Sequence, residues 1–366
     1  MKLGTMIACE KFSAKKPSRF EILLAAAAIV FVLGVAPGRA RGQTVAAAKP
    51  IPAKGDVILL LGTQGGPVLS ERRSEPATLL IVDGRPYLID CGIGTVRRML
   101  DADVPSQTVG TIFLTHDHPD HALGLVDVLA NDFLAVDFGA GTRQEFSIYG
   151  PPETPALVRA AYDYIRIPYG IFAAEPLGAS TLLNPFKVHV IDHDGLVYQD
   201  DKIRVTAAEN THYQLLPAKY HASMKSYSYR FQTPYGVIVF TGDTGESAAV
   251  ETLAKGADVL VSEVEDLGAA ENAERWPPGK SGKTNVMAEH MRKEHLPMKT
   301  VGELASKAQV KAVILYHFVG GEDGPRFAAG VKQYYSGPVF AGEDLARYCL
   351  GTTTGGAGLH QLTPCQ

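Results

Sequence analysis

Hydrophobic residues in this chain occur as short runs, rich in β-branched side chains, that end at polar or glycine-containing turns. Runs over 109–114, 203–207 and 312–316 predict strands, and residues 77–82 and 86–90, joined by Asp83-Gly84, predict a hairpin. The residues after His295 follow a helical spacing through Leu304. Strands that alternate with helices in this way are typical of an α/β protein, and periodicity alone says no more than that.

The first 40 residues follow a different pattern. Residues 11–19 carry positive charge, residues 22–35 form an apolar run without a charge, and Gly38-Arg39-Ala40 places small residues at a cleavage position. We therefore predict a signal peptide over 1–40 and a periplasmic or secreted protein that keeps no stable membrane anchor after cleavage. A single spanning anchor is the alternative, although the apolar run is short for about 30 Å of hydrocarbon.

The rest of the chain is expected to hold one domain. Residues 41–55, rich in alanine and proline, predict a flexible linker, followed by a catalytic domain over 56–350 and a C-terminal tail over 351–366. Cys349 and Cys365 flank this Gly/Thr-rich tail and could form a disulfide in an oxidising compartment, although a sequence does not give the geometry of the pair.

The densest group of reactive side chains follows the predicted strand 109–114. The run Thr115-His116-Asp117-His118-Pro119-Asp120-His121 places three imidazoles and two further carboxylates within seven residues. His116 and His118 point the same way because a strand alternates its faces, and Asp120 and His121 follow where the chain turns toward a helix. Imidazole with carboxylate suits zinc, iron or manganese better than calcium, and a polar loop with solvated histidines is the alternative.

Three further candidate ligands lie downstream: His212 after the apolar run 203–207, Asp243 in Phe240-Thr241-Gly242-Asp243-Thr244, and His317 at the end of the apolar run 312–316. With them a two-metal centre can be assembled. His116, His118 and His212 would hold one ion; Asp120, His121 and His317 would hold the second; Asp243 would bridge them. Two ions about 3.5 to 4 Å apart can clamp both the attacking and the leaving oxygen of a displacement. We expect two zinc ions per chain, although this ligand set also accepts manganese or iron. Taken singly, His212 could be a loop histidine and Asp243 a turn residue.

These residues, in this order, resemble the His-x-His-x-Asp-His signature and downstream ligands of the metallo-β-lactamase-fold hydrolases. The resemblance covers about 56–348 and implies a four-layer αββα sandwich. The opening Leu60-Leu61-Gly62-Thr63-Gln64-Gly65-Gly66-Pro67 resembles the glycine turn of ribonuclease Z and the related arylsulfatases and phosphodiesterases, although any glycine loop can form such a turn. Asp243 stands where thiol-using β-lactamases carry cysteine, which favours the dinuclear hydrolase branches.

The same resemblance implies roles around the metal site. His295 would protonate or stabilise the leaving group, and Glu263, in Val261-Ser262-Glu263, would pair with it and keep it a proton donor. His290 could be the functional histidine instead, or both could be exposed residues at a helix end. Asp120 would also accept a proton from the attacking water. Asp90 would orient a ligand histidine or cap the following turn.

We therefore expect an exported di-zinc hydrolase in which a metal-bound hydroxide cleaves an ester bond, with a phosphodiester or sulfate ester of a small molecule as substrate. A lactonase or β-lactam hydrolase of the same fold is the alternative, tested by whether Tyr213 or Tyr227 reaches the ring carbonyl. A non-catalytic metal-containing binding protein is the alternative of another class. A homodimer is compatible with the fold.

Charge and export bear on the partner. The net charge is −4, whereas a tRNA-end nuclease is expected to carry a basic face, and an exported protein does not meet cytosolic tRNA. We therefore expect no nucleic-acid partner. Two segments could shape the substrate pocket: an aromatic stretch within 151–201, which could equally pack into the core, and the loop 268–283 with Trp276.

Overall fold

Two β-sheets form the centre of the protein. The structure, a computed structural model, describes residues 51–66, 69–137, 146–175, 186–266, 286–351 and 363–365. Within these residues the first sheet has the strand order β15-β14-β1-β2-β3-β4-β5-β6 and the second the order β13-β12-β11-β10-β9-β8-β7. The strands are β1 (Asp56–Gly62), β2 (Ala77–Val82), β3 (Arg85–Ile89), β4 (Thr111–Phe113), β5 (Phe146–Gly150), β6 (Phe186–Val190), β7 (Gly195–Gln199), β8 (Arg204–Glu209), β9 (Tyr227–Gln232), β10 (Val237–Phe240), β11 (Val259–Glu265), β12 (Ala312–Val319), β13 (Val339–Ala341), β14 (Arg347–Leu350) and β15 (Thr363–Pro364).

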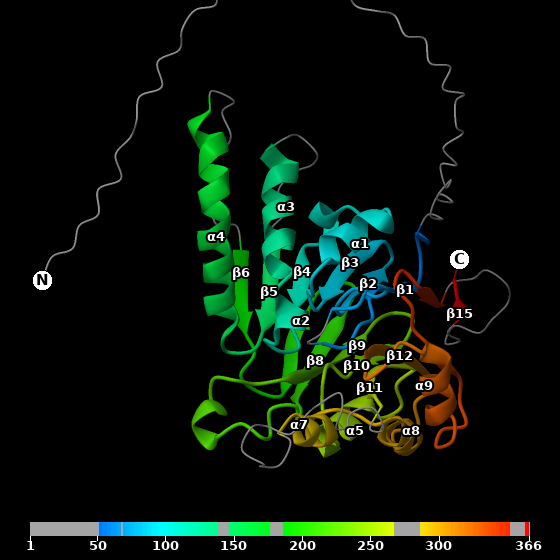
Figure 1. The fold of residues 1–366 in the computed structure, drawn as a ribbon. Coiled ribbons are helices and arrows are strands. Elements are labelled where there is room, and N and C mark those ends of the chain that lie inside the picture. The colour runs from blue at the N-terminus through cyan, green and yellow to red at the C-terminus, as the bar shows by residue number, and fades with distance from the viewer. Residues whose placement is uncertain are drawn as a thin grey trace, which may run out of the picture. The chain divides into compact units, whose positions relative to one another are not determined.

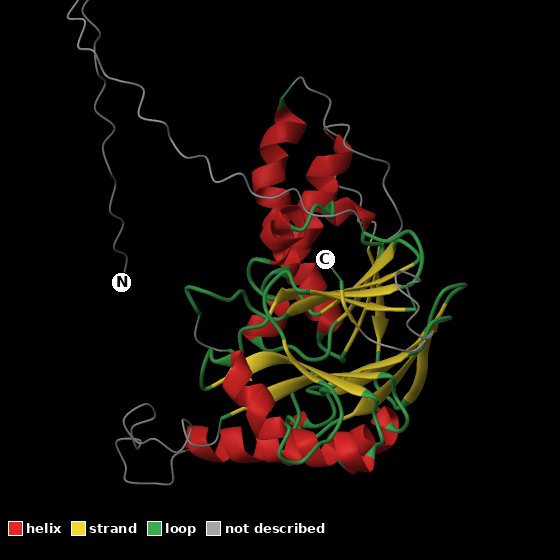
Figure 2. Ribbon diagram, turned by 90° about the vertical axis from the view of Figure 1, so that its right-hand side faces the viewer, coloured by secondary structure: helices red, strands yellow, loops and turns green. Residues whose placement is uncertain are grey.

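Helices cover the outer face of each sheet, which gives four layers (Figures 1 and 2). The first sheet packs against α1 (Thr95–Asp101), α3 (Leu125–Asp137) and α4 (Thr154–Ala174), and the second against α5 (Ala248–Ala254), α8 (Met298–Lys307) and α9 (Gly324–Val331). The short α2 (Pro119–Ala122) and α7 (Val286–Glu294), and the 3-10 turns Ser106–Thr108 and Ala218–Tyr220, complete the described elements. The predicted αββα sandwich is confirmed.

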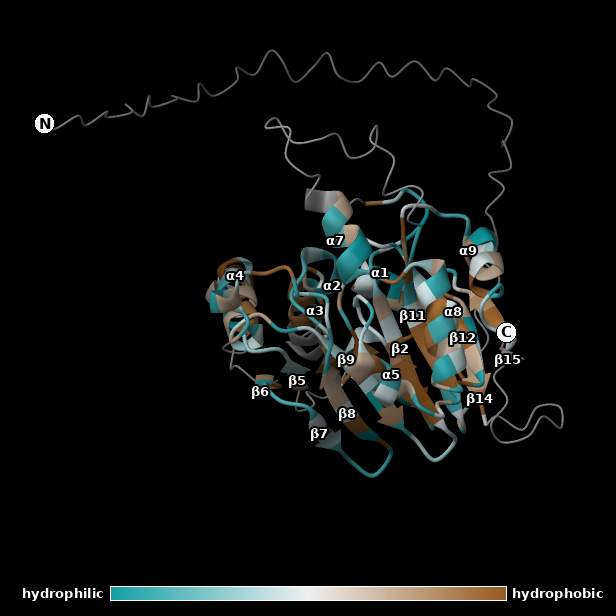
Figure 3. Ribbon diagram, turned by 90° about the horizontal axis from the view of Figure 1, so that it is seen from below, coloured by the Kyte–Doolittle hydropathy of each residue, from teal (hydrophilic) through white to brown (hydrophobic). Residues whose placement is uncertain are grey.

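The alternation of side chains along β1 shows how one strand serves two cores. Val57, Leu59 and Leu61 belong to the core under the helices of the first sheet. Ile58 and Leu60 belong to the core between the two sheets. Because both faces are buried, the strand reads as a continuous apolar run rather than an alternating one. Hydrophobic residues also dominate β11 and β12 beneath α8 (Figure 3).

The predicted local elements match the structure where it describes them. The hairpin turn between β2 and β3 has positive φ at Asp83 (47°) and Gly84 (81°), the conformation that an Asp-Gly turn supplies. The aromatic stretch lies mostly on α4, where it is divided: Ile165 and Tyr169 are buried, while the opposite face is exposed. The helical spacing after His295 corresponds to α8.

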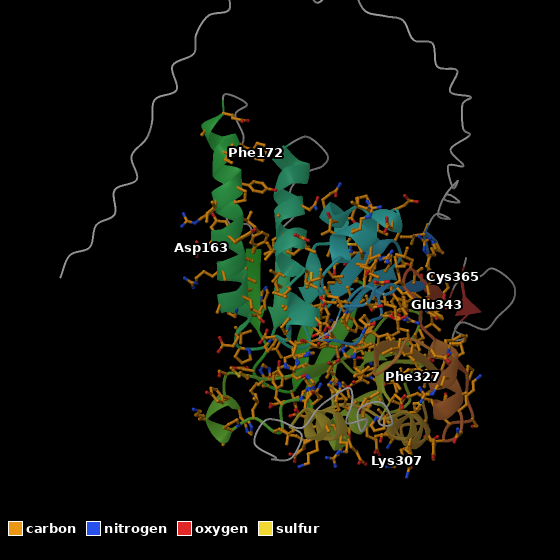
Figure 4. All side chains as sticks on the ribbon, in the orientation of Figure 1. Asp163, Phe172, Lys307, Phe327, Glu343 and Cys365 are labelled. Carbon is orange, nitrogen blue, oxygen red and sulfur yellow. A yellow bond between two sulfur atoms is a disulfide. The ribbon has the colours of Figure 1, made fainter. Side chains whose placement is uncertain are left out.

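Several expectations fall on residues outside the described ranges: the signal peptide, most of the linker, the loop around Trp276 and most of the tail. All described residues lie in one compact unit, Ala48–Gln366. None of the helices within them is both long enough and apolar enough to cross a membrane. The open question about Cys349 and Cys365 has an answer, because the two form a disulfide with Cα atoms 5.5 Å apart that joins the end of the chain to β14 (Figure 4).

Parallel pairing brings the reactive residues together. β3 pairs in parallel with β4, and β11 pairs in parallel with both β10 and β12, so the carboxyl ends of these strands meet at common edges. The run from Thr115 to His121 follows β4, Asp243 follows β10, and His317 lies near the end of β12. Asp120 and His317, which are 197 positions apart in the chain, therefore meet between the two sheets.

Candidate metal centre

Three histidines form the first group of side chains. His116 Nε2 lies 3.1 Å from His118 Nδ1, and His212 Nε2 lies 2.9 Å from the same atom. His116 and His212 are fully buried, and His118 is half-buried. These are the three residues that the sequence assigned to one ion, and the structure brings them together.

A second group, of two carboxylates and two histidines, lies beside the first. His317 Nε2 is 3.3 Å from Asp120 Oδ2 and 3.1 Å from Asp243 Oδ2, while His121 Nε2 is 3.5 Å from Asp120 Oδ2 and 3.4 Å from Asp243 Oδ1. One ligand atom from each of the four residues lies within 4.8 Å of the others. The structure therefore also brings together the residues expected around a second ion.

Asp243 stands between the groups. Its Oδ2 is 3.9 Å from both His116 Nε2 and His212 Nε2, in addition to its contacts with His121 and His317. A single carboxylate thus faces ligand atoms of both groups, which is the position required of a bridge.

A buried carboxylate–histidine pair lies beside Asp243. His295 Nδ1 lies 2.6 Å from Glu263 Oε2 and 3.9 Å from Asp243 Oδ2. The side chains of Glu263 and His295 are 0% and 5% exposed, so the pair is shielded from solvent. The contact expected between Glu263 and His295 is present.

Residues behind the ligands set the tautomers of the histidines. Asp90 Oδ2 accepts a hydrogen bond of 2.9 Å from His121 Nδ1, and the Glu294 carbonyl oxygen accepts one of 2.8 Å from His212 Nδ1. In the neutral form of either ring, Nε2 is the nitrogen left with a lone pair directed at the centre. Asp90 also accepts from the Thr115 amide at 2.7 Å, so it both orients a histidine and caps the turn.

Burial governs the charge of the first group. It holds the pKa of His116 and of His212 well below the ordinary histidine value, and it lowers the pKa of His118 to about 4. Three neutral imidazoles whose nitrogens converge within about 3 Å offer lone pairs to one another, and a cation between them satisfies all three.

Carboxylates govern the second group. Burial disfavours a charge on His121 and His317, but Asp243 and Asp120 outweigh it, which raises the pKa of His121 well above its usual value and that of His317 to about 10. Burial likewise opposes the charges of Asp120 and Asp243, and the two histidines overcome it and lower both carboxyl pKa values. The buried carboxylates thus require positive charge, which a divalent cation supplies as well as protons do.

The donor set therefore fits metal ions. His121 Nε2 and Asp243 Oδ1 are buried and lie 3.4 Å apart, longer than an ordinary hydrogen bond, and neither forms a hydrogen bond with any other described residue. Buried polar atoms without partners are rare unless they serve a ligand or an ion. Nitrogen and carboxylate oxygen together match zinc, manganese or iron.

Three contributors to the centre were not found by reading the sequence. Gly66 donates its amide to Asp120 Oδ2 at 3.0 Å, and a Cβ on Gly66 would lie 2.2 Å from that oxygen, so only glycine allows this approach. Thr115 and Glu294 act through hydrogen bonds to ligand histidines. In the sequence, the one sign of a role is that Thr115 precedes His116 and Glu294 precedes His295. Being adjacent in the chain does not reveal a contact. Of the two tyrosines proposed to reach a lactone, Tyr213 lies beside the centre, its ring centroid 5.2 Å from that of His118, and Tyr227 is buried in the core.

Comparison with known proteins places these residues in a family context. Residues 85–318 match the family model described as the Beta-lactamase superfamily domain. Ribonuclease Z of Mycobacterium avium (strain 104) is 28% identical over 301 residues, 79% of this chain and 96% of that protein, and ribonuclease Z of Mycolicibacterium gilvum (strain PYR-GCK) is 28% identical over 298 residues, 79% and 94% respectively.

Solved structures agree on the fold. The metallo-β-lactamase fold protein YhfI from Bacillus subtilis superposes with a TM-score of 0.56 at 16% identity, covering 81% of this chain and 99% of that one. The short form of human tRNase Z superposes with a TM-score of 0.53 at 20% identity, covering 80% and 98%.

The expectation of no nucleic-acid partner is wrong, because relatives that match 79% of this chain are ribonucleases. That expectation relied on predicted export, which argues only against cytosolic tRNA, and on the net charge, which sums over the whole surface. A charged substrate is recognised by the groups nearest to it, and the net charge does not report that local field.

Proposed function

The chain belongs to the β-lactamase superfamily, in its ribonuclease Z branch, as its motifs predicted, and from this premise we propose that it is a metal-dependent phosphodiesterase that cleaves RNA. It is a hydrolase of the metallo-β-lactamase fold. The observation that carries the proposal is the position of Asp243, which faces both ligand groups and lies 3.9 Å from the closed Glu263–His295 pair. Such a centre can contact the phosphate group, the attacking water and the leaving oxygen at the same time.

We propose that zinc occupies both groups, held as the sequence suggests: the first ion by His116, His118 and His212, the second by Asp120, His121 and His317, with Asp243 shared. Bound there, the ions would polarise the phosphate and make water a stronger acid. The arrangement of neutral imidazoles and ionised carboxylates supports this assignment.

The protein's own residues would move the protons. Asp120 Oδ2, fixed by the Gly66 amide and by His317, is placed to accept a proton from the attacking water. His295 holds its Nδ1 proton on Glu263, so Nε2 remains to protonate the departing oxygen. Burial opposes a charge on His295, but the attraction of Glu263 outweighs it and raises the pKa of His295, which keeps the proton in place until it is transferred.

One experiment tests the proposal. The purified mature protein is analysed for metal, and the same sample is assayed on an RNA oligonucleotide, bis-p-nitrophenyl phosphate, p-nitrophenyl sulfate, a lactone and nitrocefin. We expect close to two zinc ions per chain, cleavage of RNA and of the phosphodiester, and loss of both activities in Asp120→Ala. His193→Ala is the matched control, since His193 is exposed and bonds only to Asp192 among the described residues.

Other results would redirect the proposal. Hydrolysis of the sulfate ester alone would assign the arylsulfatase activity, and hydrolysis of the lactone or of nitrocefin alone would assign the alternative hydrolase. A metal-free protein that stays inactive after zinc is added would refute the mechanism and favour the binding protein.

We also propose that the enzyme acts outside the cytoplasm. The predicted signal peptide supports this, and so does the Cys349–Cys365 disulfide, because such bonds persist in oxidising compartments. Cell fractionation with mass spectrometry of the mature N-terminus tests it. A cytosolic protein that keeps residues 1–40 would refute it.

A further inference from the structure

Two carboxylate–histidine pairs lie side by side at the centre. One is the closed pair Glu263–His295; the other is formed by His290 and Glu294, whose Nδ1 and Oε2 atoms are hydrogen-bonded. The rings of His290 and His295 are 5.1 Å apart. The side chains of His295 and Glu294 are both 5% exposed, whereas that of His290 is 25% exposed, so the second pair is open to solvent at its histidine and the first is closed.

The open pair is fixed to the metal ligands. Glu294 accepts the Leu215 amide at 2.7 Å through its side chain and His212 Nδ1 at 2.8 Å through its backbone carbonyl. The last turn of α7 is therefore tied to the loop that carries His212. His290, one turn earlier, has its ring 5.6 Å from His212 and 6.2 Å from His118.

The free nitrogen of His290 suits a hydroxyl. Glu294 occupies Nδ1, and no described residue forms a hydrogen bond with Nε2. A neutral ring would accept a hydrogen bond at Nε2, and a protonated ring would donate one. A hydroxyl group can do either in return, so the contact does not depend on the charge of the ring.

We infer that His290 binds the 2′-hydroxyl of the ribose whose 3′ oxygen leaves phosphorus. The inference rests on the proposed RNA phosphodiesterase function. In that reaction water gives one proton to Asp120 as its oxygen bonds to phosphorus, the bond from phosphorus to O3′ breaks, and His295 delivers a proton to O3′. The 2′-hydroxyl is on the neighbouring carbon, and His290 is the histidine next to His295. His290 transfers no proton in this step; it makes the site select RNA over DNA, since the 2′-hydroxyl distinguishes the two.

Paired oligonucleotides test this reading. They are identical except that the ribose at the cleaved bond carries either a 2′-hydroxyl or a 2′-hydrogen. We expect the native enzyme to favour the ribose form by about tenfold in kcat/KM, the worth of one net hydrogen bond. His290→Ala should bring the ratio close to one, with the loss falling on the ribose form. His290→Gln, which keeps a hydrogen-bonding group near the position of Nε2, should restore part of the preference, and His193→Ala should keep all of it.

Three results would overturn the inference. A preference that survives in His290→Ala would place the 2′-hydroxyl elsewhere. Equal losses on both oligonucleotides would make His290 a structural residue. A native enzyme that cleaves both oligonucleotides equally well would show that His290 does not recognise the 2′-hydroxyl. Failure of the proposed function looks different, because the native enzyme would then cleave neither oligonucleotide nor bis-p-nitrophenyl phosphate.

Discussion

The most direct test of the mechanism is the leaving-group dependence of His295→Ala. If His295 protonates the departing oxygen, its removal matters most where that oxygen is a poor leaving group, such as the alkoxide of a sugar. General acids contribute roughly 10²- to 10⁴-fold to a rate. A nitrophenolate leaves without a proton, so the same variant should lose less than about tenfold on bis-p-nitrophenyl phosphate.

The structure also sets the size of the effect expected when Glu263, the hydrogen-bond partner of His295, is replaced. Glu263 and His295 share a hydrogen bond of 2.6 Å between an imidazole and a carboxylate, away from solvent. Hydrogen bonds to charged groups are worth about 1.5–3 kcal/mol. Glu263→Gln keeps an acceptor but removes the charge, so we expect a loss of roughly 10- to 100-fold on alkyl leaving groups, smaller than that of His295→Ala.

The assay is kcat/KM for phosphodiesters whose leaving groups range from nitrophenol to a simple alcohol. Plotted against leaving-group pKa, the rates of His295→Ala should fall more steeply than those of the native enzyme. Zinc content is measured in parallel, because His295 Nδ1 lies only 3.9 Å from Asp243. A uniform loss along the whole series, with zinc retained, would refute the role of His295 as a proton donor.

Three further outcomes follow from the structure. Asp243→Asn should hold less than one zinc ion per chain by elemental analysis, because its carboxylate faces both ligand groups, and full retention would contradict the bridging position. Burial outweighs the hydrogen bond from Thr233 and raises the pKa of Asp56 from 3.8 to about 7. As the pH rises, the unfolded chain therefore loses this proton before the folded protein does. The free energy of unfolding falls across that pH range by at most about 4 kcal/mol. Asp56→Asn should therefore flatten the denaturant midpoint between pH 4 and 7, and an unchanged slope would show that Asp56 is ionised in the fold. Reduction of the Cys349–Cys365 disulfide, which closes a separation of 16 residues, should cost up to about 3 kcal/mol and lower the Tm, whereas Cys365→Ser should have the lower Tm already and no response to reductant.

The chemistry of the centre was readable from the chain because the ligands lie at strand ends. His116 and His118 lie just beyond β4, and two residues spaced i, i+2 on extended backbone project both imidazoles to one side, which is a local property of the backbone. The apolar runs before His212, Asp243 and His317 marked further strand ends in the same way. The αββα architecture came from the resemblance, since hydrophobic spacing by itself indicated only an α/β chain.

Other features depended on distance in space, which the order of residues does not contain. The choice between His290 and His295 stayed open in the sequence, because both precede the same predicted helical segment. The structure shows Glu263 at His295 and Glu294 at His290. The backbone of Gly66 reaches Asp120 across 54 positions. The partner prediction failed because net charge adds up residues without saying where they lie, and because predicted export argues against cytosolic tRNA and not against every nucleic acid.

The sequence by itself therefore determined which donor atoms this protein can offer to a metal and where each strand presents them. Only the tertiary structure decided which of those atoms lie in contact, which histidine is buried and which is exposed to solvent, and which cysteines form a disulfide. The physical reason is that side-chain alternation is set by neighbouring residues, whereas the packing of two sheets sets the contacts between residues far apart in the chain.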